Sequence, residues 1–391
     1  MNNSSRNYRR PSPQKRAETP ARTKRQILVT DYDPIIFICV FILLLIGIVM
    51  VLSSSYYSAL RDPKVSSMFF YFRKQFFAAC LGFVAMIVMA MIDYHLLGPV
   101  IPFFYAIANG LLVYARLYGE PVNGAYRWVN LGISFQPSEF AKAMVVLMLA
   151  YFLAGGKDRT KSLSGLLGSA AIVALPCFLV FWGNNLSTAL IIVAIGFSML
   201  FVSRSRVKLL LGSAFGGAGA LFMYLQFFSG SFRGGRLEAW KDPWKFPTDI
   251  GFQTIQSLYA VASGGLFGLG LGQSRQKLKY MPEPQNDFIF AVICEELGFF
   301  GAAVVLLLFG ILIWRSVKVA LNAADLLGSL IATGIVAQIG VQVIINVSVV
   351  TNTLPNTGIP LPFISFGGTS LAFLMAMMGV LLNVSKFNRI K

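Results

Sequence analysis

The sequence is poor in the side chains that hold metal ions or form disulfides. It has four cysteines and one histidine in 391 residues. The cysteines lie far apart inside apolar runs, without CxxC spacing, at positions 39, 80, 177 and 294. Zinc sites and disulfide frameworks need clustered or regularly spaced ligands, so we expect neither and interpret the cysteines as small core residues. His95, in the polar gap MIDYHLLG, is predicted to lie at a membrane interface.

Charge is scarce as well, and acidic charge most of all. Only 13% of residues are charged and 56% are hydrophobic, whereas soluble domains are about 25% charged. The 33 basic residues outnumber the 16 acidic ones, giving a net charge of +17. The basic excess lies in the N-terminal segment and in short loops between apolar runs. This pattern suits an anionic membrane surface and argues against a nucleic-acid partner.

Long apolar runs dominate the rest of the sequence. A helix needs about 20 apolar residues to cross a bilayer, which predicts an all-α polytopic membrane protein with about ten transmembrane helices. The predicted spans are 34–53, 75–92, 97–115, 137–154, 164–182, 186–203, 207–228, 287–314, 326–348 and 361–383. A large extracellular loop, 229–286, separates the seventh span from the eighth.

Lysine and arginine in the short loops predict the orientation. We expect a disordered basic cytoplasmic tail over residues 1–33, a membrane domain over 34–385 and a short cytoplasmic tail over 386–391. With both termini in the cytoplasm, the polar segments 116–136, 229–286 and 349–360 gather at the outer face.

The acidic stretch 278–301 is the strongest candidate for a functional site. Asp287 stands where a polar loop meets an apolar run, and Glu295 and Glu296 lie two turns further on. A carboxylate inside a membrane is costly and needs a partner, a cavity or a proton. Asp287 or its neighbour Asn286 could instead cap the helix, and the two glutamates could form internal ion pairs. Glu283 is a further acidic candidate.

The segment before the fourth span carries the first group of cationic candidates. Arg127, beside a tryptophan, could anchor the protein at the interface or bind a phosphate. Lys142 follows Glu139 by three residues on one helical face, which favours an internal ion pair but also allows contact with a lipid phosphate. Gln136, Ser138 and Glu139 are candidates for lining a cavity.

The large loop and the last outer loop supply the remaining candidates. Lys277 and Lys279 directly precede the acidic stretch and could hold the phosphates of a pyrophosphate-linked lipid. Prolines prevent a straight helix in the last outer loop, and irregular backbone at membrane depth is tolerated where it lines a cavity. The predicted cavity wall consists of Gln256, Pro360, Pro362, Ser365, Gly367 and Gly368.

Four segments together resemble the SEDS family (shape, elongation, division and sporulation) of polytopic peptidoglycan polymerases. They are RWVNLGISFQPSEFAK, GFQTIQSLYAVASGGLFGLGLGQS, PEPQNDFIFAVICEELGF and TGIPLPFISFGGTS, and the resemblance covers roughly residues 34–385. Within the family, DPWK, GLGLGQSRQKL and PEPQNDF look closer to the division-type FtsW branch and its sporulation relatives than to the rod-type branch.

The resemblance implies polymerisation of lipid II at the outer face of a bacterial cytoplasmic membrane, with release of undecaprenyl pyrophosphate. The essential aspartate of the family falls on Asp287, and the family's glutamate pair falls on Glu295 and Glu296. The resemblance also implies a class B penicillin-binding transpeptidase and divisome proteins as partners, at the division septum. A divalent cation, Mg²⁺ or Mn²⁺, could share the work on the phosphates, although no spacing identifies its ligands.

The chain departs from the family pattern at Asn185, where an aspartate often stands. Two other classes of function also fit ten spans with intramembrane charges. A lipid flippase or transporter would place its charged site near the bilayer midplane and often shows sequence repeats, neither of which is evident here. A scaffold without turnover would only dock a partner through its outer loops.

Overall fold

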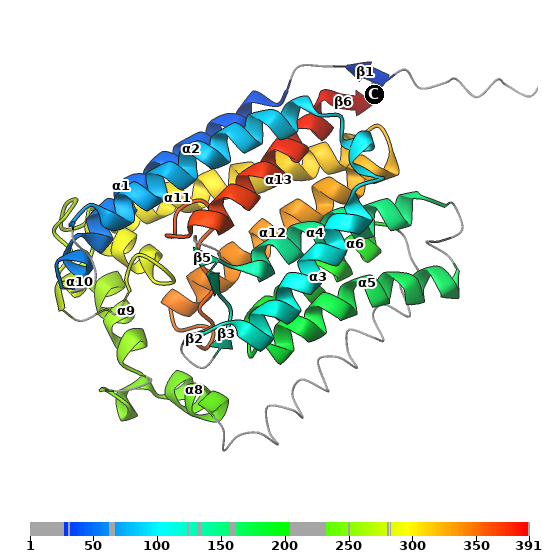
Figure 1. The fold of residues 1–391 in the computed structure, drawn as a ribbon. Coiled ribbons are helices and arrows are strands. Elements are labelled where there is room, and N and C mark those ends of the chain that lie inside the picture. The colour runs from blue at the N-terminus through cyan, green and yellow to red at the C-terminus, as the bar shows by residue number, and fades with distance from the viewer. Residues whose placement is uncertain are drawn as a thin grey trace, which may run out of the picture.

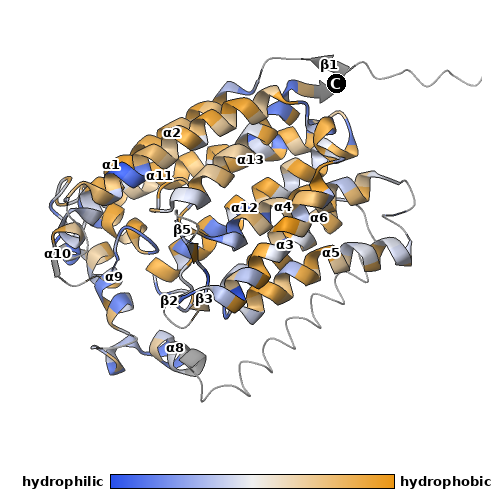
Figure 2. Ribbon diagram, in the orientation of Figure 1, coloured by the Kyte–Doolittle hydropathy of each residue, from blue (hydrophilic) through white to orange (hydrophobic). Residues whose placement is uncertain are grey.

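The computed structural model describes residues 27–29, 32–61, 67–122, 125–130, 134–156, 159, 162–203, 232–248, 251–279, 281 and 283–389. Within these ranges the chain forms a bundle of long apolar helices with short, mostly polar elements at its two ends (Figures 1 and 2).

Eight helices of the described chain are long and apolar enough to span a membrane. They are α1 (Pro34–Arg61), α2 (Phe70–Met91), α3 (Ile101–Tyr118), α4 (Pro137–Ala154), α5 (Leu163–Trp182), α11 (Ile289–Asn322), α12 (Leu326–Val350) and α13 (Gly368–Lys386). The shorter apolar helix α6 (Leu186–Val202) matches the sixth predicted span. The all-α polytopic fold is confirmed, and the predicted seventh span, 207–228, lies outside the described residues.

The last predicted span begins later than expected. Helix α13 starts at Gly368, seven residues after the predicted start at Leu361. Pro360 and Pro362 interrupt helical hydrogen bonding, and Phe363 has a positive φ of 63°. The Ser365 hydroxyl accepts from the Leu361 amide at 2.8 Å, which holds the segment in a compact turn. The sequence rule for apolar length missed this turn because its residues are apolar.

Helices α11, α12 and α13 form the centre of the bundle, with α1 and α2 on one side and α3 to α6 on the other (Figure 1). Glycines permit the tightest of these contacts. A Cβ on Gly379 of α13 would lie 2.2 Å from the Met86 carbonyl oxygen of α2, so the two backbones pack almost directly together. Small residues serve this purpose in membrane bundles, where close packing drives helix association.

The two ends of the bundle differ. At one end lie β2 (Pro121–Val122), β3 (Ala125–Tyr126), β4 (Val129–Asn130), β5 (Ser134–Phe135), α8 (Phe232–Lys241), η2 (Pro243–Lys245), α9 (Phe252–Ser263) and α10 (Gln276–Lys279). At the other end β1 (Ile27–Val29) pairs antiparallel with β6 (Phe387–Arg389) (Figure 1). Three segments predicted to be outer loops, 116–136, 229–286 and 349–360, thus gather at one end wherever they are described.

The β1–β6 ribbon joins the two predicted cytoplasmic tails. Residues 1–26, most of the predicted disordered tail, lie outside the described residues. Next to the ribbon, Asp33 pairs with Arg315 of α11 at 2.6 Å. The other Asp33 carboxylate oxygen accepts from the amides of Ile35 and Ile36 and so caps α1.

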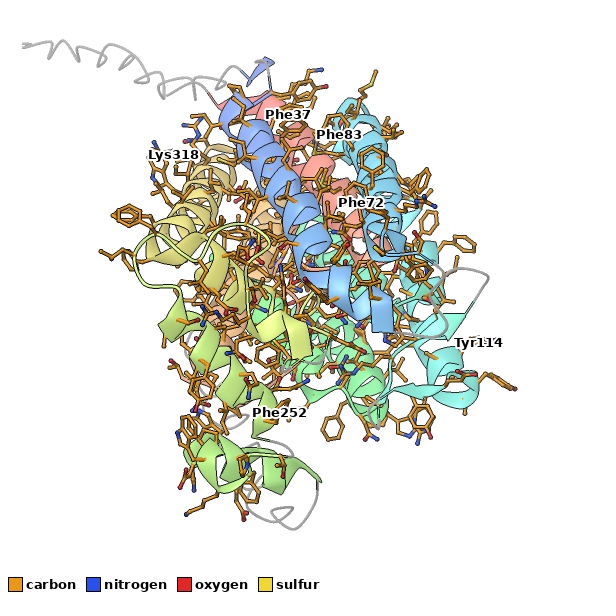
Figure 3. The ribbon with its side chains drawn as sticks, turned by 90° about the vertical axis from the view of Figure 1, so that its left-hand side faces the viewer. Phe37, Phe72, Phe83, Tyr114, Phe252 and Lys318 are labelled. Atoms are coloured by element: carbon orange, nitrogen blue, oxygen red, sulfur yellow. The ribbon has the colours of Figure 1, made fainter. Side chains whose placement is uncertain are left out.

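Aromatic and aliphatic side chains cover the outside of the bundle, as a lipid-facing surface requires. Phe37 of α1 and Phe83 of α2 lie against each other, with ring centroids 5.9 Å apart, and Lys318 lies on α11 at the same end (Figure 3). The prediction of core cysteines is confirmed for Cys39 and Cys294 and wrong for Cys80, which is exposed on α2. Its position faces outward because the inward face of α2 packs on α13.

His95 lies at the end that carries the termini, between two carboxylates. In the 3-10 turn η1 (Tyr94–Leu97), its ring nitrogens are 2.6 Å from Asp93 and 2.9 Å from Asp325, the N-cap of α12. The Tyr94 hydroxyl donates to Asp325 as well, at 2.9 Å. Burial lowers the pKa of His95, but its hydrogen bonds and the two negative charges outweigh this and leave the pKa raised.

We expect the His95 contribution to stability to disappear in alkaline solution. The folded pKa is raised above the unfolded value of about 6.5, so the stabilisation is complete below that value and is lost as pH rises through the folded pKa. Melting temperatures of wild type and His95→Gln should therefore converge between about pH 5.5 and about pH 9. Arg315→Met, which breaks an ion pair without histidine, should show a difference from wild type that stays constant over this range.

Candidate active site

Asp287 lies in the turn that leads into α11. Asn346 of α12 holds this turn: its side-chain amide donates to the carbonyl oxygens of Asp287 and Ile359, both at 2.8 Å. The N-cap position of α11 is occupied by Phe288, not by the predicted Asn286 or Asp287. Glu283, exposed and with a positive φ of 49°, accepts from the Asn286 side chain at 2.7 Å.

Three segments distant in sequence meet at Asp287. Gly358, in the non-helical segment before α13, has a φ of 64°. A Cβ placed on it would lie 3.1 Å from Asp287 Oδ2 and 3.5 Å from Arg127 Nη1. The carboxylate and the guanidinium therefore reach the same side of Gly358, and the absence of a side chain there leaves room for both.

Arg127 has an unusual electrostatic environment for an arginine in a loop. Burial lowers the pKa of its guanidinium, and the negative charge of Asp287 opposes that effect. Its Nε is buried without a hydrogen-bond partner. Arg127 also lines a small pocket together with Ser138 at the start of α4 and Asn185 at the start of α6. A buried cation with an unused donor can bind a phosphate or carboxylate oxygen.

Asn185 is a structural cap in this chain. Its side chain accepts from the Thr188 amide at 3.2 Å and so begins α6. Asparagine caps a helix about as well as aspartate does, so the departure from the family pattern leaves the helix start intact and removes one negative charge from the pocket.

The predicted pair of Glu139 and Lys142 is present and buried. Lys142 Nζ lies 2.7 Å from Glu139 Oε1, with side chains 1% and 6% exposed. Ser370 of α13 donates to the other Glu139 oxygen at 2.9 Å, which joins α4 to α13. Gln136, at the N-cap position of α4, donates to Ser138 at 3.3 Å. With its ammonium paired inside α4, Lys142 neutralises the glutamate that Ser370 of α13 contacts.

A second buried ion pair joins α10 to α11, further along the chain than Asp287. Lys277 Nζ is 2.6 Å from Glu296 Oε1, and the two side chains are 1% and 0% exposed. Glu295 accepts from the Ser274 hydroxyl and, at 2.9 Å, from the Arg275 amide. The internal pairing expected for Glu296 is thus present, with Lys277 as its partner. Lys279 is in α10, and its side chain lies outside the described part of the chain.

Helix α11 is broken at Gly298, just after the glutamates. Gly298 has φ 68° and ψ −168°, which are not helical. The glycine-rich hairpin 264–272 fills the break: Leu269 and Gly270 donate to the carbonyls of Glu295 and Glu296, at 2.9 and 3.0 Å. Phe299 and Phe300 donate back to the hairpin. Backbone groups freed within a membrane helix need such internal partners.

Most of the predicted cavity wall belongs to the non-helical segment before α13, and Gln75 holds the end of this segment next to the helix. Gln75 of α2, fully buried, donates to the Ser365 carbonyl at 3.3 Å and accepts from the Gly367 amide at 3.2 Å. Gly367 is the N-cap of α13, and Gly368 is its first residue. Pro360 and Pro362 lie in the same segment, close in sequence to Gly358. Gln256, also predicted, is buried in α9.

Sequence reasoning missed four residues that shape this region. Gln75, Asn346 and Ser53 are polar side chains inside apolar helices, a signal that the sequence does contain. Gly358 gave no signal of its own, because its positive φ and its position beside both Asp287 and Arg127 depend on how three segments meet.

The described residues offer no ready site for the divalent cation. They contain no group of three or more His, Cys, Asp or Glu side chains arranged to hold a metal ion. The Arg127 guanidinium lies on the same side of Gly358 as the Asp287 carboxylate, and its positive charge repels a cation.

This structure defines a class of protein: a polytopic membrane protein with a charged, partly buried site at one end of its helix bundle. The sequence profile of the FtsW/RodA/SpoVE family, described as a cell cycle protein, matches residues 33–390. The chain belongs to this family, and the predicted membership in the SEDS proteins is confirmed.

Relatives of two branches are similar over nearly the whole chain. Stage V sporulation protein E of Bacillus subtilis is 41% identical over 366 residues, 92% of this chain and 98% of the relative. A probable peptidoglycan glycosyltransferase FtsW of a Geobacter species is 39% identical over 363 residues, 91% and 97% of the two chains.

Solved structures show the same fold. One, described as the structural coordination of polymerization and crosslinking by a peptidoglycan synthase complex, matches with a TM-score of 0.76 and 26% identity, covering 90% of this chain and 97% of that one. The rod shape determining protein RodA of Thermus thermophilus matches with a TM-score of 0.66 and 26% identity, covering 90% and 96%.

We expect Gly298→Ala to destabilise the protein. The Gly298 backbone, at φ 68° and ψ −168°, lies in a region essentially restricted to glycine, and it costs alanine about 1–3 kcal/mol. In addition, its Cβ would lie 2.3 Å from the Gly268 amide nitrogen. Gly310, in the same helix, has open space around it, so Gly310→Ala should leave stability unchanged or slightly higher. Thermal unfolding in detergent measures both, and equal melting temperatures would contradict the close packing at the break.

Proposed function

We propose that this protein is a peptidoglycan glycosyltransferase that polymerises lipid II at the outer face of the cytoplasmic membrane. The observation that carries the proposal is the meeting of Asp287, Arg127 and Gly358 at the end of the bundle where the predicted outer segments gather. A carboxylate and a guanidinium on one side of an open backbone position suit a reaction in which a hydroxyl oxygen loses its proton and a pyrophosphate leaves a sugar carbon.

The reaction consistent with this geometry is a single displacement. The Asp287 carboxylate accepts the proton of the acceptor's sugar hydroxyl. The hydroxyl oxygen bonds to the anomeric carbon of the donor while the bond from that carbon to the pyrophosphate oxygen breaks. The anomeric configuration inverts, the leaving undecaprenyl pyrophosphate takes the electron pair, and Asp287 later releases the proton to solvent.

Arg127 is the cation best placed to stabilise the leaving group. Its guanidinium keeps its charge at physiological pH because the ordinary pKa of arginine lies above 12. The buried Nε and the pocket beside Ser138 give it an unused donor near Asp287. Lys142 and Lys277, predicted for the same role, have their ammonium groups in buried ion pairs.

We infer that segment 351–367 keeps water away from the site, so that the sugar donor reacts with a sugar hydroxyl and not with water. Asn346 and Gln75 fix this segment from two helices. Excluding water from the site protects a reactive sugar donor from hydrolysis and strengthens the charge interactions there.

Membership in the family supports an inference about the partner and the cellular position. We infer a penicillin-binding transpeptidase of class B and divisome proteins as partners, both termini in the cytoplasm, and a place at the division septum. A sporulation-stage role is the second candidate, because a sporulation protein of Bacillus subtilis is 41% identical to this chain. A fluorescent fusion at the vegetative septum supports the first role, whereas a signal confined to spore formation supports the second.

Asp287→Asn should abolish most polymerisation. A general base of this kind contributes about 10² to 10⁴-fold, so the rate should fall by at least about 10²-fold. The assay uses purified protein, lipid II and a cognate transpeptidase, with glycan products separated by size. A mutant polymerisation rate within a factor of about two of the wild-type rate would show that Asp287 is not the base of the reaction.

The same preparation separates an enzyme from a transporter. If wild type makes no polymer with its partner while reconstituted vesicles move lipid II across the bilayer, the protein is a flippase. Absence of both activities, with a complex still formed, would indicate a scaffold.

Gly358→Ala should impair polymerisation in a folded protein. Its Cβ would lie 3.1 Å from Asp287 Oδ2, and displacing reacting groups by about 1 Å costs on the order of 10²-fold. Gly272→Ala is the matched control, since Gly272 has a φ of 80° but open space around it. Similar polymerisation by both variants would show that the open position beside Asp287 is not needed.

A further inference from the structure

We propose that Lys277, Glu296 and Ser53 form a positioning device for Asp287. The three side chains fix residues 289–297, the part of α11 before the break at Gly298, which we call the half-helix. Asp287 lies in the turn that leads into this half-helix. This inference rests on the proposed function and assigns Lys277 a role other than phosphate binding.

The device is a closed triangle of polar groups inside the bundle. Lys277 Nζ donates to Glu296 Oε1 at 2.6 Å and to Ser53 Oγ at 2.9 Å. The Ser53 hydroxyl lies 2.8 and 2.7 Å from the two oxygens of Glu296. Lys277 and Glu296 are essentially unexposed, so a phosphate would have to break the ion pair to reach the ammonium. The triangle joins α1, α10 and α11.

The break at Gly298 makes this anchoring necessary. Residues 289–297 form a continuous helix of about 13 Å, at about 1.5 Å per residue. The left-handed backbone of Gly298 separates this half-helix from the remainder of α11. The rest of α11 therefore cannot fix its direction through continuous helical hydrogen bonds, and contacts from other segments must do so.

Anchors are present at both ends of the half-helix. At the Asp287 end, Asn346 holds the Asp287 carbonyl, and the Phe366 amide donates to the Gln285 carbonyl at 2.9 Å. At the far end are the hairpin 264–272 and the triangle of Lys277, Glu296 and Ser53. If the far end moves, the half-helix tilts and carries Asp287 away from Arg127 and Gly358.

A broken triangle would move the far end because the remaining charge could not stay where it is. Removing one partner of a buried ion pair leaves an uncompensated charge, which drives rearrangement or water entry. Removing both partners leaves none. The double variant should therefore be less impaired than the product of the two single effects predicts.

The test compares Lys277→Met, Glu296→Gln and the double variant in the polymerisation assay with full chain and partner. Each single variant should lower kcat at least about tenfold with KM for lipid II within about twofold of wild type, as loss of a transition-state interaction does. The double variant should recover part of the lost kcat. Ser53→Ala, which removes only the bridging hydroxyl, should fold normally and show a smaller loss of kcat.

Arg315→Met is the matched control. It breaks an ion pair of the same helix, but beyond the break at Gly298 and at the opposite end of the bundle. It should lower the melting temperature and leave kcat unchanged. An equal loss of kcat in this variant would mean that kcat follows overall stability, which would overturn the proposal.

A second measurement does not depend on turnover. Hydrogen exchange of the amides in 285–292 should be faster in Lys277→Met and Glu296→Gln, and unchanged in Arg315→Met. Unchanged exchange in this segment would overturn the proposal whether or not polymer forms. So would a raised KM with unchanged kcat in Lys277→Met alone, which would make Lys277 a phosphate ligand. An inactive wild type would instead count against the proposed function.

Discussion

The break in α11 at Gly298 is the constraint on which the rest of the site depends. A membrane helix cannot leave its backbone groups without partners, so the carbonyls of Glu295 and Glu296 are satisfied by the hairpin 264–272. That hairpin can approach because Gly264 and Gly268 lack side chains: a Cβ on either would lie about 2 Å from a carbonyl oxygen of α11. The outer loop is thereby fixed to the helix that begins beside Asp287.

Buried polar groups divide into two kinds in this bundle. Glu139 with Lys142, inside α4, and Glu296 with Lys277, between α11 and α10, form closed buried pairs. Arg127, by contrast, keeps a buried Nε without a hydrogen-bond partner, close to Asp287. Closed pairs contribute to a unique arrangement of helices, whereas an unused buried donor is available to a ligand. From this difference we infer that Arg127 contacts the substrate, whereas the two lysines have structural roles.

The opposite end of the bundle is built for a different purpose. The β1–β6 ribbon, the Asp33–Arg315 pair and His95 between Asp93 and Asp325 tie both termini to the helices. These contacts are partly exposed, and that of His95 depends on pH. The site end is held instead by buried pairs and backbone hydrogen bonds, as a site that must keep its geometry needs.

The sequence by itself determined the class of fold, because apolar length is a local signal, and the family, through the four motifs that resemble it. It also made Asp287 the first candidate for the site, because a carboxylate where a polar loop meets an apolar run is a local signal. It also gave the Glu139–Lys142 pair, since a spacing of three places both side chains on one helical face. Tertiary structure alone decided that Lys277 pairs with Glu296, that Gln75 and Asn346 hold the segment before α13, and that Asp287 and Arg127 meet on one side of Gly358. These contacts join residues from about 20 to over 290 positions apart, and residue spacing carries no information on which distant segments meet. The late start of α13, by contrast, has a local cause, because Pro360 and Pro362 interrupt helical hydrogen bonding and the Leu361 amide donates to Ser365. The rule for apolar length missed it since the turn is apolar, and only the tertiary structure shows which distant side chains, Gln75 and Asn346, fix that turn.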